Sequence, residues 1–265
     1  MKFKNVLLAS DFDGTLKNDD GVITDDVIGA IQKFMAEGGS FTVCTGRVYQ
    51  GFHLYNKKYI NAPVLMGNGA MAYDYEKNEI IFNDAVGIEG IPALNAVLEA
   101  FPNIPIELYN FDRVCAINLN EHSYQHFTSQ DITFENVARP EDAPLPWTKV
   151  MIAAHGCSQE VQKILDSFPE INYLKTTEDY VEILKKGVDK GTGLLKLAKA
   201  MGIKEQDVYS AGDGYNDVEM LVAARAGFVP KNGSQEALGV ATYVTRSNNE
   251  GCVANAIEIL DELYS

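Results

Sequence analysis

The strongest constraint on the fold is the segment Asp11-Phe12-Asp13-Gly14-Thr15-Leu16, which directly follows the apolar run Val6-Leu7-Leu8-Ala9. An apolar run that ends in a polar, glycine-containing turn is typical of a buried parallel strand, which delivers the next residues to the carboxyl edge of a sheet. Open α/β sheets bind their ligands at that edge. We therefore expect a site beside Asp11, although the segment could also be an acidic surface turn.

Three further apolar runs end in small polar loops: 41–44 before Thr45-Gly46-Arg47, 63–66 before Gly67-Asn68-Gly69, and 207–211 before Gly212-Asp213-Gly214. A helix with one apolar face separates the first two strands, with Thr24 as its cap and Gly38-Gly39 at its end. Such alternation predicts an α/β fold with a Rossmann-like parallel sheet.

The pattern changes after the hairpin expected at 71–82. We predict strands at 106–108, 114–119, 149–154, 173–174 and 181–183 and helices at 91–100 and 159–168. This mixture indicates an α+β domain inserted into the sheet domain. The expected organisation is a discontinuous catalytic core of residues 1–82 and 187–265, with a cap domain at 83–186.

The net charge of −15 over 265 residues argues against nucleic acid and anionic membranes as partners, because both recruit basic surfaces. A phosphorylated small molecule remains possible, since a cation and a few lysines can reverse the local potential. Because a predicted strand begins almost at the N-terminus and no apolar stretch reaches about 20 residues, we expect a cytoplasmic protein. The four cysteines form no C-x-x-C pair, so we expect reduced thiols.

Each polar loop carries groups that suit a phosphate site. Thr45-Gly46 offers a hydroxyl and a backbone N–H that could bind a phosphoryl oxygen; the alternative is a helix cap. Lys190 lies at an expected helix start, where its ammonium could neutralise phosphate charge; the alternative is a solvated lysine. Gly212-Asp213-Gly214-Tyr215-Asn216-Asp217 supplies oxygen ligands without histidine, which suits a hard cation such as Mg²⁺, or is an acidic helix N-terminus.

Together the four loops resemble, in order and spacing, the four motifs of the haloacid dehalogenase superfamily of phosphohydrolases. Asp11-x-Asp13-Gly14-Thr15 is similar to the first motif, Thr45 to the second, Lys190 to the third, and the 212–217 loop to the fourth. The insertion between the second and third motifs resembles the Cof-type branch with its large α/β cap.

The resemblance implies a two-step phosphoryl transfer. Asp11 would attack phosphorus to form an aspartyl-phosphate, and Asp13 would act as general acid and then as general base. Mg²⁺ would be held by Asp11, Asp213 and the backbone carbonyl of Asp13. The groups implied to bind the substrate phosphate are Gly14, Thr15, Thr45, Gly46 and Lys190, and those implied to orient them from outside are Asn216 and Asp217.

The expected function is a Mg²⁺-dependent phosphatase that hydrolyses small phosphate monoesters, with sugar phosphates as the favoured class. The alternatives are a phosphomutase of the same superfamily and a non-catalytic regulator that binds a phosphorylated ligand. We expect a monomer or weak homodimer. In the cap, His122 and His126 are predicted to lie on a polar helix face, and Trp147 in an extended loop with substrate contact as the lesser alternative.

Overall fold

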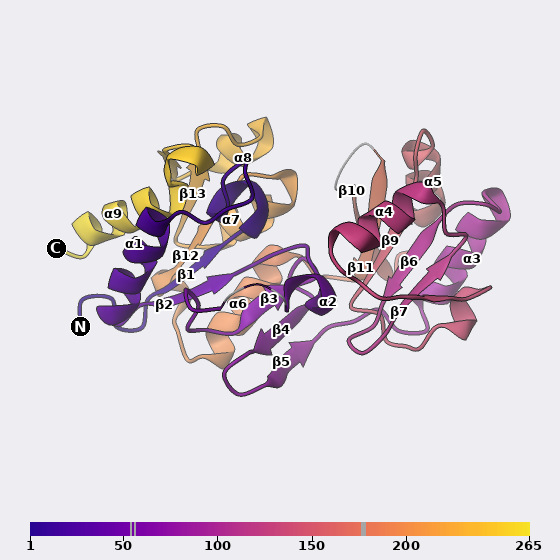
Figure 1. Cartoon of the computed structure of the whole chain (residues 1–265), viewed down its shortest axis with the longest axis horizontal. Coiled ribbons are helices and arrows are strands. Elements are labelled where there is room, and N and C mark those ends of the chain that lie inside the picture. Colours follow the sequence, from indigo (N-terminus) through magenta and orange to yellow (C-terminus); the bar gives the residue numbers. More distant parts are fainter. Residues whose placement is uncertain (54, 56, 176–178) are drawn as a thin grey trace. The chain divides into compact units, whose positions relative to one another are not determined.

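The computed structural model describes residues 1–53, 55, 57–175 and 179–265 (Figure 1). The chain forms two compact units. Unit 1 comprises the described parts of Met1–Gly46, Asn56–Phe82 and Asp189–Ser265, and unit 2 those of Arg47–Tyr55 and Asn83–Val188. The expected domain limits assign residues 47–55 to the core instead, and those limits stay predictions.

Unit 1 is built on a five-stranded parallel sheet in the order β14-β13-β12-β1-β2. The strands are β1 Leu7–Ser10, β2 Ser40–Val43, β12 Val208–Ala211, β13 Ala226–Pro230 and β14 Tyr243–Thr245. In the register of the central strands, Leu8 lies between Tyr209 and Phe41. Every residue of β1 is buried, as expected for a parallel strand that is covered on both faces.

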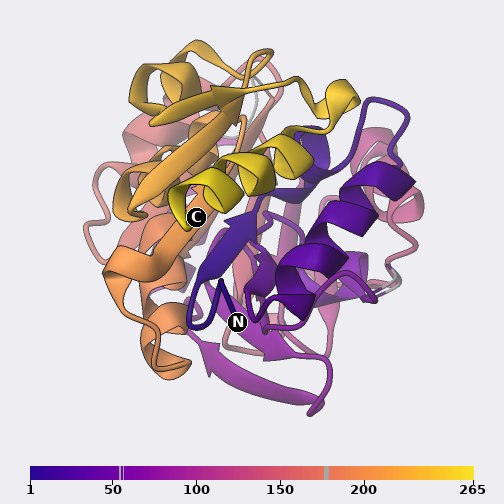
Figure 2. The same cartoon turned by 90° about the vertical axis from the view of Figure 1, so that its left-hand side faces the viewer.

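Helices cover both faces of this sheet: α1 Asp25–Ala36, α6 Lys190–Ala200, α7 Val218–Ala223, α8 Gln235–Val240 and α9 Cys252–Leu263. α1 and α9 lie side by side over one face (Figure 2), where the Phe3 ring packs 4.8 Å from that of Phe34 and 5.7 Å from that of Tyr264. Leu7 and Ala9 point to the opposite face and join the apolar cluster of α6. The expected α/β class with a Rossmann-like sheet is confirmed.

The third predicted strand does not belong to the main sheet. β3 Val64–Met66 pairs antiparallel with β4 Met71–Asp74 in a separate three-stranded sheet that ends with β5 Glu79–Asn83. An isolated parallel bridge between Cys44 and Leu65 connects it to the end of β2. Since a purely apolar run does not specify its pairing partner, the sequence alone could not distinguish these two arrangements.

Unit 2 contains a six-stranded sheet in the order β10-β11-β9-β6-β7-β8, antiparallel except for the parallel pair of β7 with β8. Its strands are β6 Ile106–Tyr109, β7 Val114–Ile117, β8 Glu135–Asn136, β9 Lys149–Ala153, β10 Ile171–Lys175 and β11 Tyr180–Lys185. Its helices are α2 Tyr49–Phe52, α3 Gly90–Ala100, α4 Glu121–Ser129 and α5 Ser158–Leu165. The predicted α+β character of this region is confirmed.

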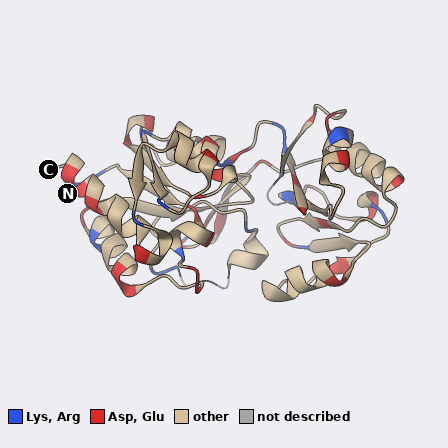
Figure 3. Ribbon diagram, turned by 90° about the horizontal axis from the view of Figure 1, so that it is seen from above, with Lys and Arg blue, Asp and Glu red and all other residues tan. Residues whose placement is uncertain are grey.

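The cysteines, the membrane-spanning potential of the helices and the distribution of charge can be compared with the sequence analysis. All four cysteines are free thiols, as predicted, and three of them are buried. Among the described residues, no helix combines the length and the apolar character needed to cross a membrane. Figure 3 shows acidic residues distributed over helices and loops of both units, interspersed with lysines and arginines.

Trp147 lies in an extended stretch before β9, as predicted, but the lesser alternative of substrate contact is wrong. Trp147 forms a two-way backbone bridge with Val86, and its side chain is fully buried in the apolar cluster of unit 2. Gly90 lies so close that a Cβ there would come within 3.3 Å of the indole ring. Trp147 is therefore a core residue of unit 2, and substrate contact is excluded by its burial.

We predict that Trp147, the only tryptophan of the chain, gives a blue-shifted fluorescence in the folded protein and reports the unfolding of unit 2. Trp147→Ala should lower the free energy of unfolding by about 3–5 kcal/mol, because it leaves a large cavity. Trp147→Phe should cost distinctly less. Urea titration followed by fluorescence, and by circular dichroism for the variants, checks both; an exposed-indole spectrum in the folded protein would contradict the placement.

Candidate active site

The polar loops that were singled out in the sequence converge on one edge of the parallel sheet. Asp11 directly follows β1, and its N–H donates to the carbonyl of Ala211 at the end of neighbouring β12 over 2.8 Å. On the other side, the N–H of Cys44 after β2 donates to the carbonyl of Ser10 over 2.8 Å. The carboxyl ends of β2, β1 and β12 therefore place the Thr45, Asp11 and Asp213 loops next to one another.

Lys190 is the central cation of this edge. Its Nζ donates to Asp11 Oδ1 over 2.5 Å and to Asp217 Oδ1 over 2.6 Å, and its side chain has no exposed surface. The residue is the first of α6, which begins with a capping box between Asp189 and Thr192. The cap fixes the start of the helix and thereby the point from which the Lys190 side chain enters the site.

Three carboxylates surround that single ammonium. Asp11, Asp213 and Asp217 can each bring an oxygen to within 4.8 Å of the other two. Burial raises the pKa of Asp11, opposed by Lys190 and reinforced by Asp217 and Asp213, and burial also raises the pKa of Asp213. Burial alone would lower the pKa of Lys190, but the carboxylates of Asp11 and Asp217 raise it instead. The ionised cluster is therefore short of positive charge.

The potential ligand atoms of this cluster suit a hard cation. All of them are oxygens, the ligand type that Mg²⁺ prefers, and no described histidine or cysteine belongs to the group. A bound cation would offset the burial, and the repulsion between carboxylates, that raise the pKa values of Asp11 and Asp213. Asp213 also accepts a hydrogen bond from Thr15 Oγ1 over 2.5 Å, which orients its carboxylate.

Asp217 has a different environment from the other two carboxylates. Its Oδ2 accepts the backbone N–H groups of Asp213 and Gly214 over 2.9 and 2.8 Å, while its Oδ1 is occupied by Lys190. Both carboxylate oxygens of Asp217 are thus already hydrogen-bonded to groups of the protein. This geometry suits a residue that shapes the 212–217 loop and holds Lys190, more than one that binds a ligand directly.

Asp13 lies outside the buried cluster. The strand β1 ends at Ser10, and the backbone coils over Phe12–Leu16. Hydrogen bonds from the Leu16 and Lys17 amides close this coil. The Asp13 side chain is consequently 48% exposed, and its Oδ1 accepts a hydrogen bond from Lys17 Nζ over 3.2 Å.

Gly14 is required by this coil. Its φ is +88°, a value that disfavours residues with a side chain, and a Cβ there would lie 2.7 Å from Asp213 Oδ2. The glycine therefore lets the Asp213 carboxylate pack against the backbone of the Asp11 loop.

Thr45 and Gly46 are connected to the site through Asn68, a residue for which the sequence analysis assigned no role. The Asn68 N–H donates to the carbonyl of Thr45 over 3.0 Å, and its Oδ1 accepts the Asn216 side-chain amide over 3.0 Å. Asn68 is completely buried with φ at 54°, within Gly67-Asn68-Gly69. The Gly-Asn-Gly pattern indicates a left-handed turn, but only the fold places it against Asn216.

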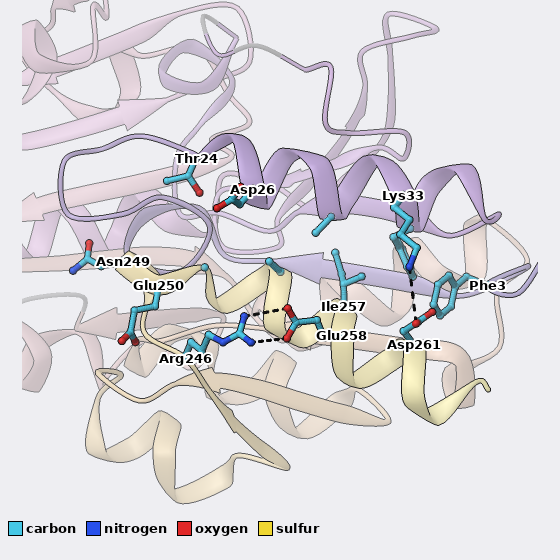
Figure 4. A pocket seen from close by; sticks show the side chains of 14 residues that line it. Phe3, Thr24, Asp26, Lys33, Arg246, Asn249, Glu250, Ile257, Glu258 and Asp261 are labelled. Carbon is cyan, nitrogen blue, oxygen red and sulfur yellow. Dashed lines mark hydrogen bonds and ion pairs between the residues drawn. The ribbon is translucent and has the colours of Figure 1, made fainter.

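A separate cavity of about 470 Å³ lies between α1 and α9 (Figure 4). Four of its charged residues form two pairs: Arg246 forms two hydrogen bonds with Glu258, and Lys33 lies 4.0 Å from Asp261. None of the candidate site residues lines it. The chemistry of the carboxyl edge, not the size of a cavity, therefore identifies the candidate active site.

Comparison with known proteins identifies the class to which this fold and site belong. A family model described as haloacid dehalogenase-like hydrolase matches residues 8–257. The chain belongs to this family and is an enzyme of haloacid dehalogenase type, as the sequence motifs predicted.

Individual relatives match nearly the whole chain. YxeH of Bacillus subtilis, whose name as a phosphatase is provisional, is 29% identical over 96% of this chain and 97% of its own length. The 5-amino-6-(5-phospho-D-ribitylamino)uracil phosphatase YitU of the same organism is 26% identical over 97% of this chain and 98% of its own. Among solved structures, the subclass IIB sugar phosphatase BT4131 aligns with a TM-score of 0.86 at 23% identity, over 97% of this chain and 99% of its own, which shows the shared fold.

We predict that Lys190→Met lowers the free energy of unfolding by about 3–5 kcal/mol, because it leaves buried carboxylates without their counter-ion. Lys199→Met is the matched control, since Lys199 lies exposed on the same helix. Its effect should stay within about 0.5 kcal/mol. Urea denaturation of both variants provides the measurement, and equal stability of the two would refute a buried ion cluster at Lys190.

Proposed function

We propose that this protein is a Mg²⁺-dependent phosphatase that hydrolyses small phosphate monoesters through an aspartyl-phosphate on Asp11. The observation that carries the proposal is the position of Asp11, which is held by Lys190 within 2.5 Å at the carboxyl edge of the sheet, in one cluster with Asp213. A nucleophile, a buried cation and oxygen ligands thus meet where a phosphoryl group can be bound.

In the first half-reaction, a carboxylate oxygen of Asp11 attacks phosphorus. A bond from Asp11 to phosphorus forms and the ester P–O bond breaks, so that the electron pair leaves with the alkoxide oxygen. Asp13 gives its proton to that oxygen. Its partial exposure suits this role, because the leaving group must extend from the buried Asp11 toward solvent.

In the second half-reaction, water attacks the phosphorus of the aspartyl-phosphate. Asp13, now a carboxylate, takes a proton from that water, the Asp11–phosphorus bond breaks, and inorganic phosphate leaves. Lys190 balances charge on the phosphoryl oxygens, while Thr45, Gly46 and the Gly14-Thr15 backbone orient them. Asn216 and Asp217 hold the loop and Lys190 in place.

The metal ion would be held by the side chains of Asp11 and Asp213 and by the backbone carbonyl of Asp13. When bound, Mg²⁺ supplies the positive charge that lets an anionic phosphate approach anionic aspartates. The raised pKa values of Asp11 and Asp213 and their all-oxygen environment support this assignment.

For the substrate class we propose sugar phosphates and related polyol phosphates. Support comes from the names of two similar proteins, YitU, whose substrate carries a phosphoribityl group, and the sugar phosphatase BT4131.

We further propose that residues 83–186 act as a cap that selects the leaving group. We also propose that the enzyme is a cytoplasmic monomer or weak homodimer, and that nucleic acid and membranes are not partners. A phosphate-release screen over a panel of metabolites tests the class; sugar isomers without free phosphate would favour a mutase.

We predict that Asp11→Asn reduces phosphate release by about 10⁴-fold or more while the fold is preserved, because an amide keeps the shape of the carboxylate but is a poor nucleophile. Asp20→Asn, at an exposed position of the following loop, is the matched control and should retain full activity. Turnover of a sugar phosphate measures both. Retention of a tenth of wild-type activity, after mass spectrometry has excluded deamidation, would disprove the covalent mechanism.

Metal dependence gives a second prediction. Activity should be lost in excess EDTA and return on addition of Mg²⁺, whereas Ca²⁺ should not restore it, because its looser coordination misplaces the phosphoryl group. Phosphate release from one sugar phosphate under each condition is the measurement. Full activity in excess chelator would contradict the metal assignment.

A further inference from the structure

Lys17 is a charged residue of the Asp11 loop to which the motif analysis assigns no function. Its Nζ lies 3.2 Å from Asp13 Oδ1, with the two residues four positions apart in the chain. Both ends of the pair lie in the coil and turn that follow β1.

The lysine is the fixed member of this pair. Only 11% of its side chain is exposed, and its Nζ lies 4.9 Å from the centre of the Phe12 ring, within the range of a cation–π interaction. Its backbone is held at both polar groups: the N–H donates to the Phe12 carbonyl over 3.0 Å, and the carbonyl accepts the Asn248 side-chain amide over 3.2 Å. The backbone and the side chain of Lys17 are therefore both held in place, which restricts the position of its ammonium.

Asp13 is the more exposed member of the pair. Its side chain is 48% exposed, in contrast to the Asp11 carboxylate at 10%. An aspartate with this exposure can exchange between side-chain rotamers unless a partner holds it. Proton transfer requires the carboxylate within hydrogen-bond reach of the leaving oxygen, so its orientation affects the rate directly.

We propose that Lys17 is a positioning residue that holds the Asp13 carboxylate in the orientation for proton transfer to the leaving group. This inference rests on the proposed phosphatase function and on the role of Asp13 within it. The ordinary alternative is an i,i+4 ion pair at the surface of the Asp13 side, with no catalytic effect and a contribution to stability below about 1 kcal/mol. The two alternatives differ in how the effect depends on the leaving group.

A leaving group of low basicity, such as 4-nitrophenolate, departs without a proton, whereas a sugar alkoxide needs one. If Lys17 acts through Asp13, Lys17→Met should lower kcat/KM for glucose 6-phosphate by about 10- to 100-fold, within the range that general acid catalysis contributes. For 4-nitrophenyl phosphate the loss should stay below about threefold. The quantity kcat/KM is appropriate because it covers the steps up to departure of the leaving group.

Three variants serve as controls. Lys17→Arg keeps the charge and should restore most of the loss with glucose 6-phosphate. Lys33→Met removes another i,i+4 partner, 3.9 Å from Glu37, and should leave both substrates unaffected. In an Asp13→Asn background, Lys17→Met should have no further effect on glucose 6-phosphate, since the group that it positions is gone.

The outcomes separate this inference from the function on which it rests. A selective loss with glucose 6-phosphate, restored by arginine and absent in the Asp13→Asn background, supports it. An equal loss with both substrates, no loss with either, or a full additional loss in the Asp13→Asn background overturns it while the phosphatase function stands. A wild-type enzyme that releases phosphate from neither substrate, nor from any other ester of the metabolite panel, overturns both. Melting curves of Lys17→Met and Lys17→Arg show whether each variant is folded.

Discussion

The ion cluster around Lys190 is the interaction on which the candidate site depends. An ammonium with no exposed surface can remain charged only if carboxylates compensate for its lost hydration, and Asp11 and Asp217 do so at 2.5 and 2.6 Å. The same contacts bring together a strand end, a helix start and the 212–217 loop, which lie far apart in the sequence. Stability and chemistry are therefore coupled: the residues that would react with a phosphate also neutralise one another in its absence.

The two aspartates of the first motif illustrate how one short segment supplies two environments. Asp11 directly follows a buried strand and is enclosed by charged partners, while Asp13, two residues later, is on the outside of a coil and half exposed. Gly14 makes this separation possible, since its left-handed backbone turns the chain beneath Asp213. Two residues only two positions apart can thus provide a nucleophile that stays desolvated and a proton carrier that reaches the leaving group.

Much of this arrangement could be predicted from the sequence, because the parallel strands are apolar runs and each ends in a conspicuous polar loop. The predictions failed where the pairing partner of a strand had to be chosen, even between segments close together in the sequence. Residues 63–66 read as another parallel strand but pair antiparallel with 71–74. No strand was predicted at 226–230, where β13 lies; this strand ends at Pro230, a residue type that is uncommon in central strands. The burial of Trp147 and the contacts of Asn68 and Lys17 likewise depend on packing, which local residue patterns do not encode.

The order of the strands has a consequence for biosynthesis. β1 is the first strand of the main sheet in chain order, and its neighbours in that sheet are β2 and β12. β12 begins only at Val208, about two hundred positions later. Because chains emerge at about 5–20 residues per second, β1 waits for its second neighbour for roughly ten seconds or more. During this interval unit 2, whose strands are encoded in between, can already fold. The acidic residues of the site can meet only after Asp217 has been synthesised, so a nascent chain cannot assemble the reactive cluster early.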